Sequence, residues 1–171
     1  MGQVFEAPEY RRSLAAFATG VAIVTTTNST GDPVGLTVNS FASVSLAPPL
    51  ILWSLRNTSP SLAAFERAEY FAVNVLTADQ QELSHRFSSP HADRFGGMMT
   101  GTGYGRVPLI EGCATRLECI HRRSHREGDH VIFIGEVLRH WRTSQSYDPL
   151  IFCDGAYKSL REIRSETSVR L

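Results

Sequence analysis

The sequence lacks the features that mark secreted, membrane-spanning or disulfide-stabilised proteins. Its three cysteines, Cys113, Cys119 and Cys153, are an odd number without a close Cys-x-x-Cys pair. Free thiols in a reducing cytoplasm are therefore expected rather than a disulfide framework. No apolar run approaches the length that crosses a bilayer, and the first residues carry Glu6 and Arg11 instead of an apolar leader. We expect a soluble, cytoplasmic protein that does not act at a membrane.

An excess of charge of one sign is also missing. The 171 residues include 17 basic and 17 acidic side chains, so no global field attracts nucleic acid. Neither a G-x-S-x-G nucleophile elbow nor an H-E-x-x-H or P-loop motif is present. The glycine-rich segment 88–112 reads as a long loop, and it lacks the third glycine and the preceding strand of a dinucleotide fingerprint. We assign this segment no phosphate-binding role.

A metal site is considered because three histidines lie close together in the sequence. His121, His125 and His130 follow Cys119 within a short span. Zinc requires a partner pair at a suitable spacing, and the interval from Cys113 to Cys119 is too wide for the usual knuckle. The five charged residues in 121–129 favour a solvated hairpin loop. We therefore expect no metal.

Strand patterns dominate the chain, and helical patterns are short. Helices are expected over Ala7–Thr19, from Pro60 onward, and from a Thr77–Gln80 capping box to about Phe87. Strands are expected at Val21–Thr27, once or twice within Val34–Leu55, and at Tyr70–Leu76, Cys113–His121, His130–Trp141 and Leu150–Phe152. Many short strands without a βαβ rhythm favour a mainly β, antiparallel barrel over a Rossmann fold. We expect a single domain over 1–160 and a polar C-terminal tail at 161–171.

The most informative stretch runs from Val34 to Pro60. It interleaves hydroxyl side chains with apolar ones and then leads into Leu62-Ala63-Ala64-Phe65. Ser59 suits the N-cap position of that helix and Pro60 its first position. With Arg56 just upstream, such a helix start can hold a phosphate. The plainer alternative is that Ser-Pro only caps the helix, and spacing alone favours that alternative.

Six segments together suggest a family. They are FATGVAIVTT, GLTVNSFASVSLAPPLILWSL, FAVNVL, LSHRF, EGDHVIFIGEV and PLIFCDGAY, in this order along nearly the whole chain. The sequence resembles the flavin reductase-like family, whose members are NAD(P)H:flavin oxidoreductases of two-component monooxygenases. The resemblance implies an FMN-binding split β-barrel, with flavin at a homodimer interface. It also implies hydride transfer from NADH or NADPH to FMN or FAD, and delivery of the reduced flavin to a separate oxygenase component.

The resemblance also implies which residues bind the flavin. Thr37, Val38, Asn39 and Ser40 would face the isoalloxazine and ribityl chain; Ser54, Leu55, Arg56, Asn57 and Ser59 would take the ribityl and phosphate end; Arg86 and Phe87 would close over the flavin or its phosphate. Without the resemblance, these sets read as strand surface, as a turn with a helix cap, and as an exposed helix end.

His130 and Tyr157 are the residues implied for the nicotinamide. His130 follows Gly128-Asp129 at the start of an expected strand, and the histidine of this GDH motif lies against the nicotinamide in the resembled family. The alternative is a solvated hairpin histidine. No catalytic side chain is expected, because the hydride passes directly between the two cofactors.

Two other functions fit the sequence less well. An FMN-binding electron carrier on the same barrel would need no nicotinamide site, so the GDH histidine argues against it. An amine oxidase on the related pyridoxamine-oxidase-like barrel matches the motifs less well. The choice between FMN and FAD stays open. No basic residue is clearly placed for a 2′-phosphate, which favours NADH over NADPH.

Overall fold

The computed structural model describes residues 6–90 and 93–160, so the tail expected at 161–171 lies outside the described residues. The helices are α1 (Ala7–Ala15), α2 (Leu62–Arg67) and α3 (Gln81–Ser88), with the 3-10 turns η1 (Ala78–Gln80) and η2 (Tyr104–Arg106). The strands are β1 (Thr19–Gly20), β2 (Ala22–Thr27), β3 (Pro33–Val38), β4 (Ala42–Leu46), β5 (Pro49–Arg56), β6 (Tyr70–Val75), β7 (Thr100–Thr102), β8 (Pro108–Ile110), β9 (Thr115–Glu127), β10 (His130–Arg142), β11 (Ile151–Cys153) and β12 (Ala156–Lys158). In this described part, no helix is long and apolar enough to cross a membrane.

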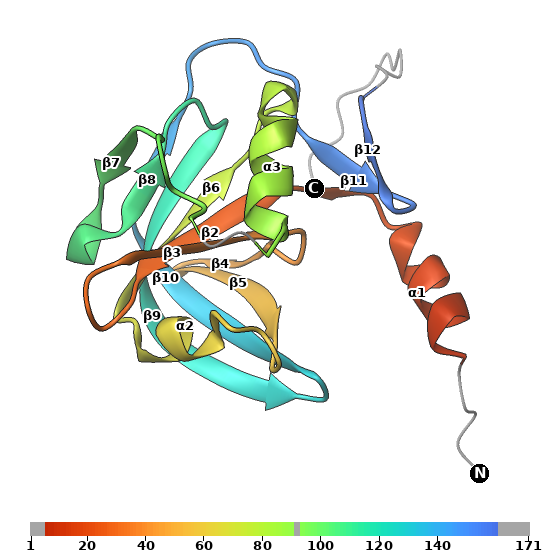
Figure 1. Ribbon diagram of the computed structural model, residues 1–171, viewed down its shortest axis with the longest axis horizontal. Coiled ribbons are helices and arrows are strands. Elements are labelled where there is room, and N and C mark those ends of the chain that lie inside the picture. The colour runs from red at the N-terminus through yellow and green to blue at the C-terminus, as the bar shows by residue number, and fades with distance from the viewer. Residues whose placement is uncertain (1–5, 91–92, 161–171) are drawn as a thin grey trace.

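Seven of the strands form one curled antiparallel sheet, in the order β3-β2-β6-β9-β10-β5-β4 (Figure 1). The expectation of a mainly β, antiparallel fold with a few short helices is therefore confirmed. Ser40, just after β3, connects the β3 side of the curled sheet to β5. Its hydroxyl accepts a hydrogen bond from the backbone N–H of Ser54 at 3.0 Å and lies 3.1 Å from the Ser54 carbonyl oxygen, to which it donates. A side chain thus joins β3 to β5 at a seam of the barrel.

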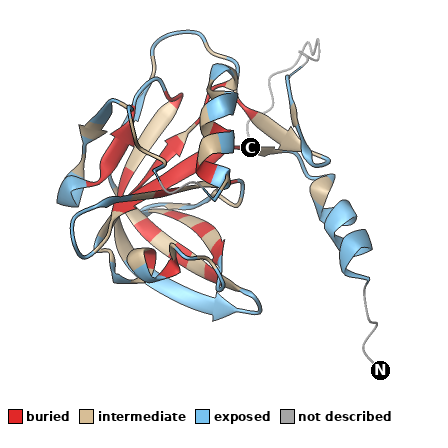
Figure 2. Cartoon of the chain, in the orientation of Figure 1, coloured by how far each residue is buried: buried red, intermediate tan, exposed pale blue. Residues whose placement is uncertain are grey.

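Aromatic side chains fill the barrel interior, and Figure 2 shows buried positions along the strands that surround it. Trp53 stacks on Phe133 with ring centroids 4.6 Å apart and meets Phe65 and Phe71 edge-on. All four are 2% exposed or less. Burial of each stabilises the fold by roughly 1.5–3 kcal/mol. Because side chains alternate along β5 and β10, the residues between these core positions point outward.

A second core lies between the sheet and α3. Phe87 of α3 is fully buried and packs with Val21, Ile23 and Leu76. The Gln80 side chain accepts a hydrogen bond from the Thr77 backbone N–H, so this part of the expected capping box is formed. Figure 1 shows α3 between the barrel and the small sheet of β1, β11 and β12, while α1 projects from the body beyond that sheet.

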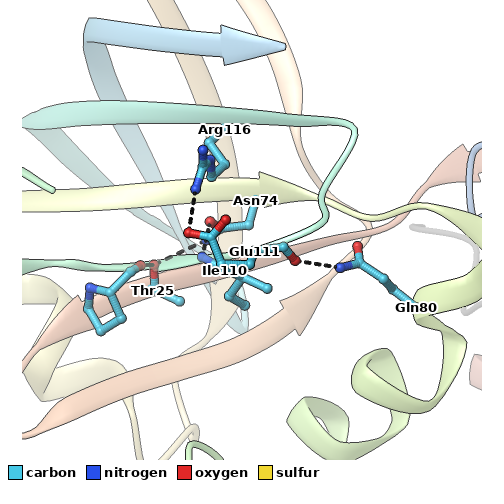
Figure 3. A network of polar contacts seen from close by, with 7 residues as sticks. Thr25, Asn74, Gln80, Ile110, Glu111 and Arg116 are labelled. Atoms are coloured by element: carbon cyan, nitrogen blue, oxygen red, sulfur yellow. Dashed lines mark hydrogen bonds and ion pairs between the residues drawn. The ribbon is translucent and has the colours of Figure 1, made fainter. Parts of the chain in front are cut away.

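Asn74 organises the crossing of β6, β2 and β8 (Figure 3). Its Nδ2 donates to the Ile23 carbonyl at 3.0 Å. The same nitrogen donates to the Thr25 hydroxyl at 3.2 Å. Its Oδ1 accepts from the Ile110 N–H at 3.0 Å. This fully buried amide is therefore satisfied by protein groups on neighbouring strands.

Several boundaries differ from the expectations. The first helix ends at Ala15, and the Thr19-Gly20 pair instead forms β1 against β11. The expectation that Ser59 caps α2 with Pro60 at its first position is wrong, because the helix begins at Leu62 after an N-cap at Ser61. Leu62 is the first position whose side chain reaches the core.

The segment expected as a charged loop, 121–129, is mostly strand. β9 continues to Glu127, and a two-residue turn of Gly128 and Asp129 leads into β10. Ion pairs from Arg122 to Glu136 and from Arg126 to Glu66 support this exposed ribbon. An exposed ribbon of this kind has no apolar alternation in its sequence.

Two further differences concern short strands. Segment 88–112, expected as a loop, contains β7, η2 and β8 among its described residues. The last expected strand forms as β11, displaced by one residue, and β12 follows it without a sequence signal. A three-residue strand is too short for an alternating pattern to stand out.

Candidate functional site

A hollow of about 470 Å³ lies at the seam of the barrel, within the volume range of ligand pockets. Its lining comes from β3 and the residues after it, the end of β5, the turn before α2, and the first residue of β10: Leu36, Thr37, Val38, Asn39, Ser40, Ser54, Leu55, Arg56, Thr58, Ser59, Pro60 and His130. The hollow therefore brings together most of the residues that were implied for the flavin on β3 and β5. It also includes the histidine of the GDH motif.

Open strand edges face this hollow. Among the described strands, β3 pairs only with β2, and the pairing of β5 with β4 stops at Leu52 and Ala42. Backbone groups on one side of β3 and on one side of the end of β5 are thus outside the sheet ladder. Some of them have other partners, because the Ser40 hydroxyl bonds both backbone groups of Ser54, the Arg56 carbonyl accepts from the Ser59 N–H, and the Gly35 carbonyl accepts from Arg94. A polar ligand is suited to the backbone groups that remain.

The residues around β3 offer different groups to the hollow. The Thr37 hydroxyl donates to the Ser84 carbonyl of α3 at 2.8 Å, which leaves its oxygen as an acceptor. Val38 is 7% exposed and packs into the core, so only its backbone is available. Asn39 is exposed. The hydroxyl of Ser40 is already engaged with Ser54 across the seam.

The end of β5 and the following turn are richer in donors. Leu55 is 6% exposed and belongs to the core, whereas Arg56 points outward into solvent. The Ser59 hydroxyl accepts a weak hydrogen bond from the Ser61 N–H at 3.3 Å and keeps its proton for another partner. Thr58 also lines the hollow, although the sequence analysis did not select it. Its place between Asn57 and Ser59 was the available signal.

His130 closes one side of the hollow. Its side chain is 38% exposed, and its Nδ1 lies 2.7 Å from Oδ1 of Asp129. The hydrogen bond with His130 lowers the pKa of the Asp129 carboxyl. In the sheet His130 is paired directly with Arg56 of β5, so the residue implied for the nicotinamide lies beside a residue implied for the flavin phosphate.

Three residues implied for the site lie away from the hollow. Phe87 is fully buried against Phe95, with ring centroids 4.9 Å apart. Arg86 donates to the backbone carbonyl of Gly96. The Tyr157 hydroxyl lies 2.7 Å from the Ser84 hydroxyl, so it reaches the Thr37 side of the site only through α3.

Among the described residues that line the hollow, no hydroxyl is hydrogen-bonded to a histidine, so no nucleophile–base pair is formed there. Burial raises the pKa of Cys113 and of Cys119 to about 12, so neither supplies a thiolate. Within the described residues, no group of three or more His, Cys, Asp or Glu side chains could hold a metal ion. What remains is a binding site of hydroxyls, open backbone and one guanidinium, suited to an organic cofactor with a phosphate.

Comparisons with known proteins agree with this chemistry. A family model described as the flavin reductase like domain matches residues 14–161. FMN reductase (NADH) SmoA of Agrobacterium fabrum is 46% identical over 148 residues, covering 86% of this chain and 83% of SmoA. The reductase component of flavin-dependent trigonelline monooxygenase from Acinetobacter baylyi is 37% identical over 100% of this chain. The chain spans 56% of that protein, and about half the length of two further relatives.

Solved structures give the same result. Nitrilotriacetate monooxygenase component B from Mycobacterium thermoresistibile has a TM-score of 0.89 at 34% identity, covering 95% of this chain and 92% of that one. The NADH:FAD oxidoreductase SgcE6 of Streptomyces globisporus, solved with NAD and FAD fragments, has a TM-score of 0.84 at 32% identity, covering 97% and 100%. These matches confirm the split-barrel fold. With the family model covering most of its length, the chain belongs to the flavin reductase like domain family.

Proposed function

We propose that this protein is a flavin reductase that transfers a hydride from NAD(P)H to a flavin and supplies the reduced flavin to a separate monooxygenase. The observation that carries the proposal is the single hollow that gathers Thr37, Asn39, Arg56, Ser59 and His130. A flavin site and a nicotinamide site must adjoin for direct hydride transfer. Family membership supports the same reaction.

The side chains have binding roles in this proposal. Thr37 and Asn39, with the open edge of β3, would hold the flavin ring and ribityl chain. Arg56, with the Thr58 and Ser59 hydroxyls, would hold the phosphate, because a guanidinium and hydroxyl donors suit its oxygens. The bound flavin supplies the hydride acceptor and the nicotinamide supplies the hydride. His130 would orient the nicotinamide ring.

We propose NADH as the reductant and FMN as the first flavin to test. SmoA is named an NADH-dependent FMN reductase, which supports this pair. SgcE6 is named an NADH:FAD oxidoreductase, so FAD is the second flavin to test. Cys113, Cys119 and Cys153 are free thiols, which suits work in the reducing cytoplasm.

Steady-state oxidation of NADH, followed at its absorbance band, tests the function directly. Purified protein with catalytic FMN should oxidise NADH, and the reduced flavin should return its electrons to oxygen. Repeating the assay with FAD and with NADPH ranks the four combinations. A protein that binds FMN yet oxidises neither nicotinamide would be the electron carrier instead.

His130→Ala separates the reductase from the carrier. We expect flavin affinity to stay nearly unchanged while kcat/KM for NADH falls by about 5- to 30-fold, as for the loss of one positioning contact. His125→Ala is a matched control, because His125 is exposed on β9 and does not line the hollow. Unaltered NADH kinetics in the His130 variant would count against its proposed role.

The partners are proposed on similar grounds. The trigonelline enzyme and HsaB of Rhodococcus jostii are named as reductase parts of monooxygenases, which supports an oxygenase partner for this chain. We also propose a homodimer with flavin near the interface. Apolar side chains on the outer face of the barrel, next to the hollow, support this arrangement. They are Leu50, Leu52, Ile132 and Ile134, each only half-buried.

A further inference from the structure

The acidic residue before His130 has a geometry that the binding roles above do not explain. Oδ1 of Asp129 lies 2.7 Å from His130 Nδ1, within hydrogen-bond distance. In the described part of the chain, Nε2 on the other edge of the ring has no hydrogen bond to the protein. The imidazole is therefore held from one side, and the other nitrogen is available beside the hollow.

Three features hold the Asp129 backbone in place. Gly128 has φ +57°, the left-handed conformation that glycine adopts at the first central position of a tight hairpin turn. The Asp129 carbonyl accepts a hydrogen bond from the Asn57 N–H at 2.9 Å. His130 itself is paired with Glu127 on one side and Arg56 on the other. The hairpin tip is thus tied to the turn that carries the proposed phosphate-binding hydroxyls.

The protonation pattern follows from the chemistry of the two groups. The Asp129 carboxyl has a lowered pKa, so at neutral pH it is an ionised group that can only accept hydrogen bonds. Nδ1 must then carry the proton, and in the neutral ring Nε2 is an acceptor. The residues paired with His130 on the two neighbouring strands, Glu127 and Arg56, also carry charge.

We propose that Asp129 is a positioning residue, which holds His130 with its proton on Nδ1 so that Nε2 can accept a hydrogen bond from the amide of the nicotinamide. The inference rests on the proposed function, because it names the reductant as the group that His130 meets. A solvated histidine of random orientation would lose side-chain conformational entropy each time NADH binds. The hydrogen bond to Asp129 orders the imidazole before NADH binds, so this loss does not weaken binding.

Kinetics of matched variants test the positioning role. Asp129→Ala should lower kcat/KM for NADH by about 3- to 10-fold and leave the dissociation constant of FMN within about 2-fold, as expected for an exposed charge-assisted contact. Glu127→Gln is the control: it removes one carboxylate from the strand beside His130, and Glu127 does not line the hollow. Equal losses in both variants would overturn the proposal, because a general effect of charge would explain them.

A double-mutant cycle separates positioning from structural support. In a His130→Ala background, Asp129→Ala should have almost no further effect on kcat/KM, since Asp129 acts through the imidazole. Independent losses that add would overturn the proposal. Asp129→Asn, whose amide oxygen can still accept from Nδ1, should restore part of the activity lost in Asp129→Ala.

Nuclear magnetic resonance tests the tautomer without substrate. In protein labelled with ¹⁵N at histidine, the His130 nitrogen shifts should show the proton on Nδ1 in the wild type and a mixture of tautomers in Asp129→Ala. A proton on Nε2 in the wild type would overturn the inference, whatever the enzyme does. The expected tautomer in a protein without NADH oxidation would instead count against the proposed function alone.

Discussion

Asn74 is a fully buried polar side chain whose removal should destabilise the fold. Asn74→Ala leaves the Ile110 N–H without an acceptor, and it removes the donor to the Ile23 carbonyl and to the Thr25 hydroxyl, in a site closed to solvent. We expect the free energy of unfolding to fall by about 2–4 kcal/mol. Urea denaturation measures this, with Asn28→Ala as the control at an exposed turn, where water replaces the lost bonds. Similar losses in both variants would contradict the role of Asn74.

Ser59 distinguishes phosphate binding from helix capping. Because α2 is capped at Ser61, Ser59→Ala should cost the fold little, while FMN affinity falls about 3- to 10-fold through one lost hydrogen bond. Riboflavin, which lacks the phosphate, should bind the variant as it binds the wild type. Ser61→Ala is the control, since Ser61 does not line the hollow. Equal losses for FMN and riboflavin, measured by fluorescence titration, would remove Ser59 from the phosphate site.

The residues implied for the flavin lie around the hollow when they are close together in the sequence, along β3 and β5. Thr37 to Ser40 and Ser54 to Ser59 lie on the two sides of one seam, so local spacing carried most of the information. Phe87 and Tyr157 lie elsewhere, because the placement of α3 and β12 depends on packing between distant segments. The sequence around LSHRF does not contain that information.

At the scale of elements, hydrogen bonds of the Glu118 side chain hold η2 against the barrel. Its carboxylate accepts from Nε and Nη2 of Arg139 on β10, at 2.6 and 2.7 Å, and from the Tyr104 backbone N–H at 2.9 Å. Burial alone would raise the pKa of Glu118, but these hydrogen bonds outweigh it, and the pKa lies below its ordinary value of 4.5. The ionised carboxylate is therefore the form that the fold stabilises.

This lowered pKa predicts an acid-dependent loss of stability. The contribution of Glu118 is fully present above the ordinary pKa and is lost as the pH falls through the lower folded value. Glu118→Gln should therefore lower the free energy of unfolding at pH 7 by about 1–3 kcal/mol and flatten its decline below about pH 4.5. Thermal unfolding from pH 7 to pH 3 measures both. If the stability of the variant and of the wild type declined in parallel with pH, the proposed role of the ionised Glu118 carboxylate would be contradicted.

Buried elements were easier to predict than exposed ones. β2, β6 and the first half of β10 carry apolar side chains at the spacing their burial requires, and each was expected within one or two residues. The outer half of β9 is rich in charged residues and exposed. Because neither of its faces is buried, its sequence lacks the apolar alternation of a strand and predicts a loop. Pairing with β10 makes it a strand.

At the scale of the whole molecule, the order of the motifs predicted the barrel. The surfaces that could contact a partner can be identified only from the structure. Leu14 and Phe17, in and just after the projecting α1, are 57% and 77% exposed. Leu52 and Ile134 face outward from directly paired positions of β5 and β10, beside the hollow. Apolar surface of this kind favours association.

We therefore expect the protein to sediment as a dimer, by an isologous contact of this outer face. Ile134→Glu should shift it to monomer and weaken FMN binding at least about 10-fold, because a charge at an apolar interface is costly. Met99→Glu, on the segment before β7, places the same charge on an 84% exposed side chain and should change neither property. Circular dichroism of the Ile134 variant checks that its barrel is intact. A folded monomer that binds FMN as tightly as the wild type would separate the flavin site from the interface, and the hollow of one chain would then suffice.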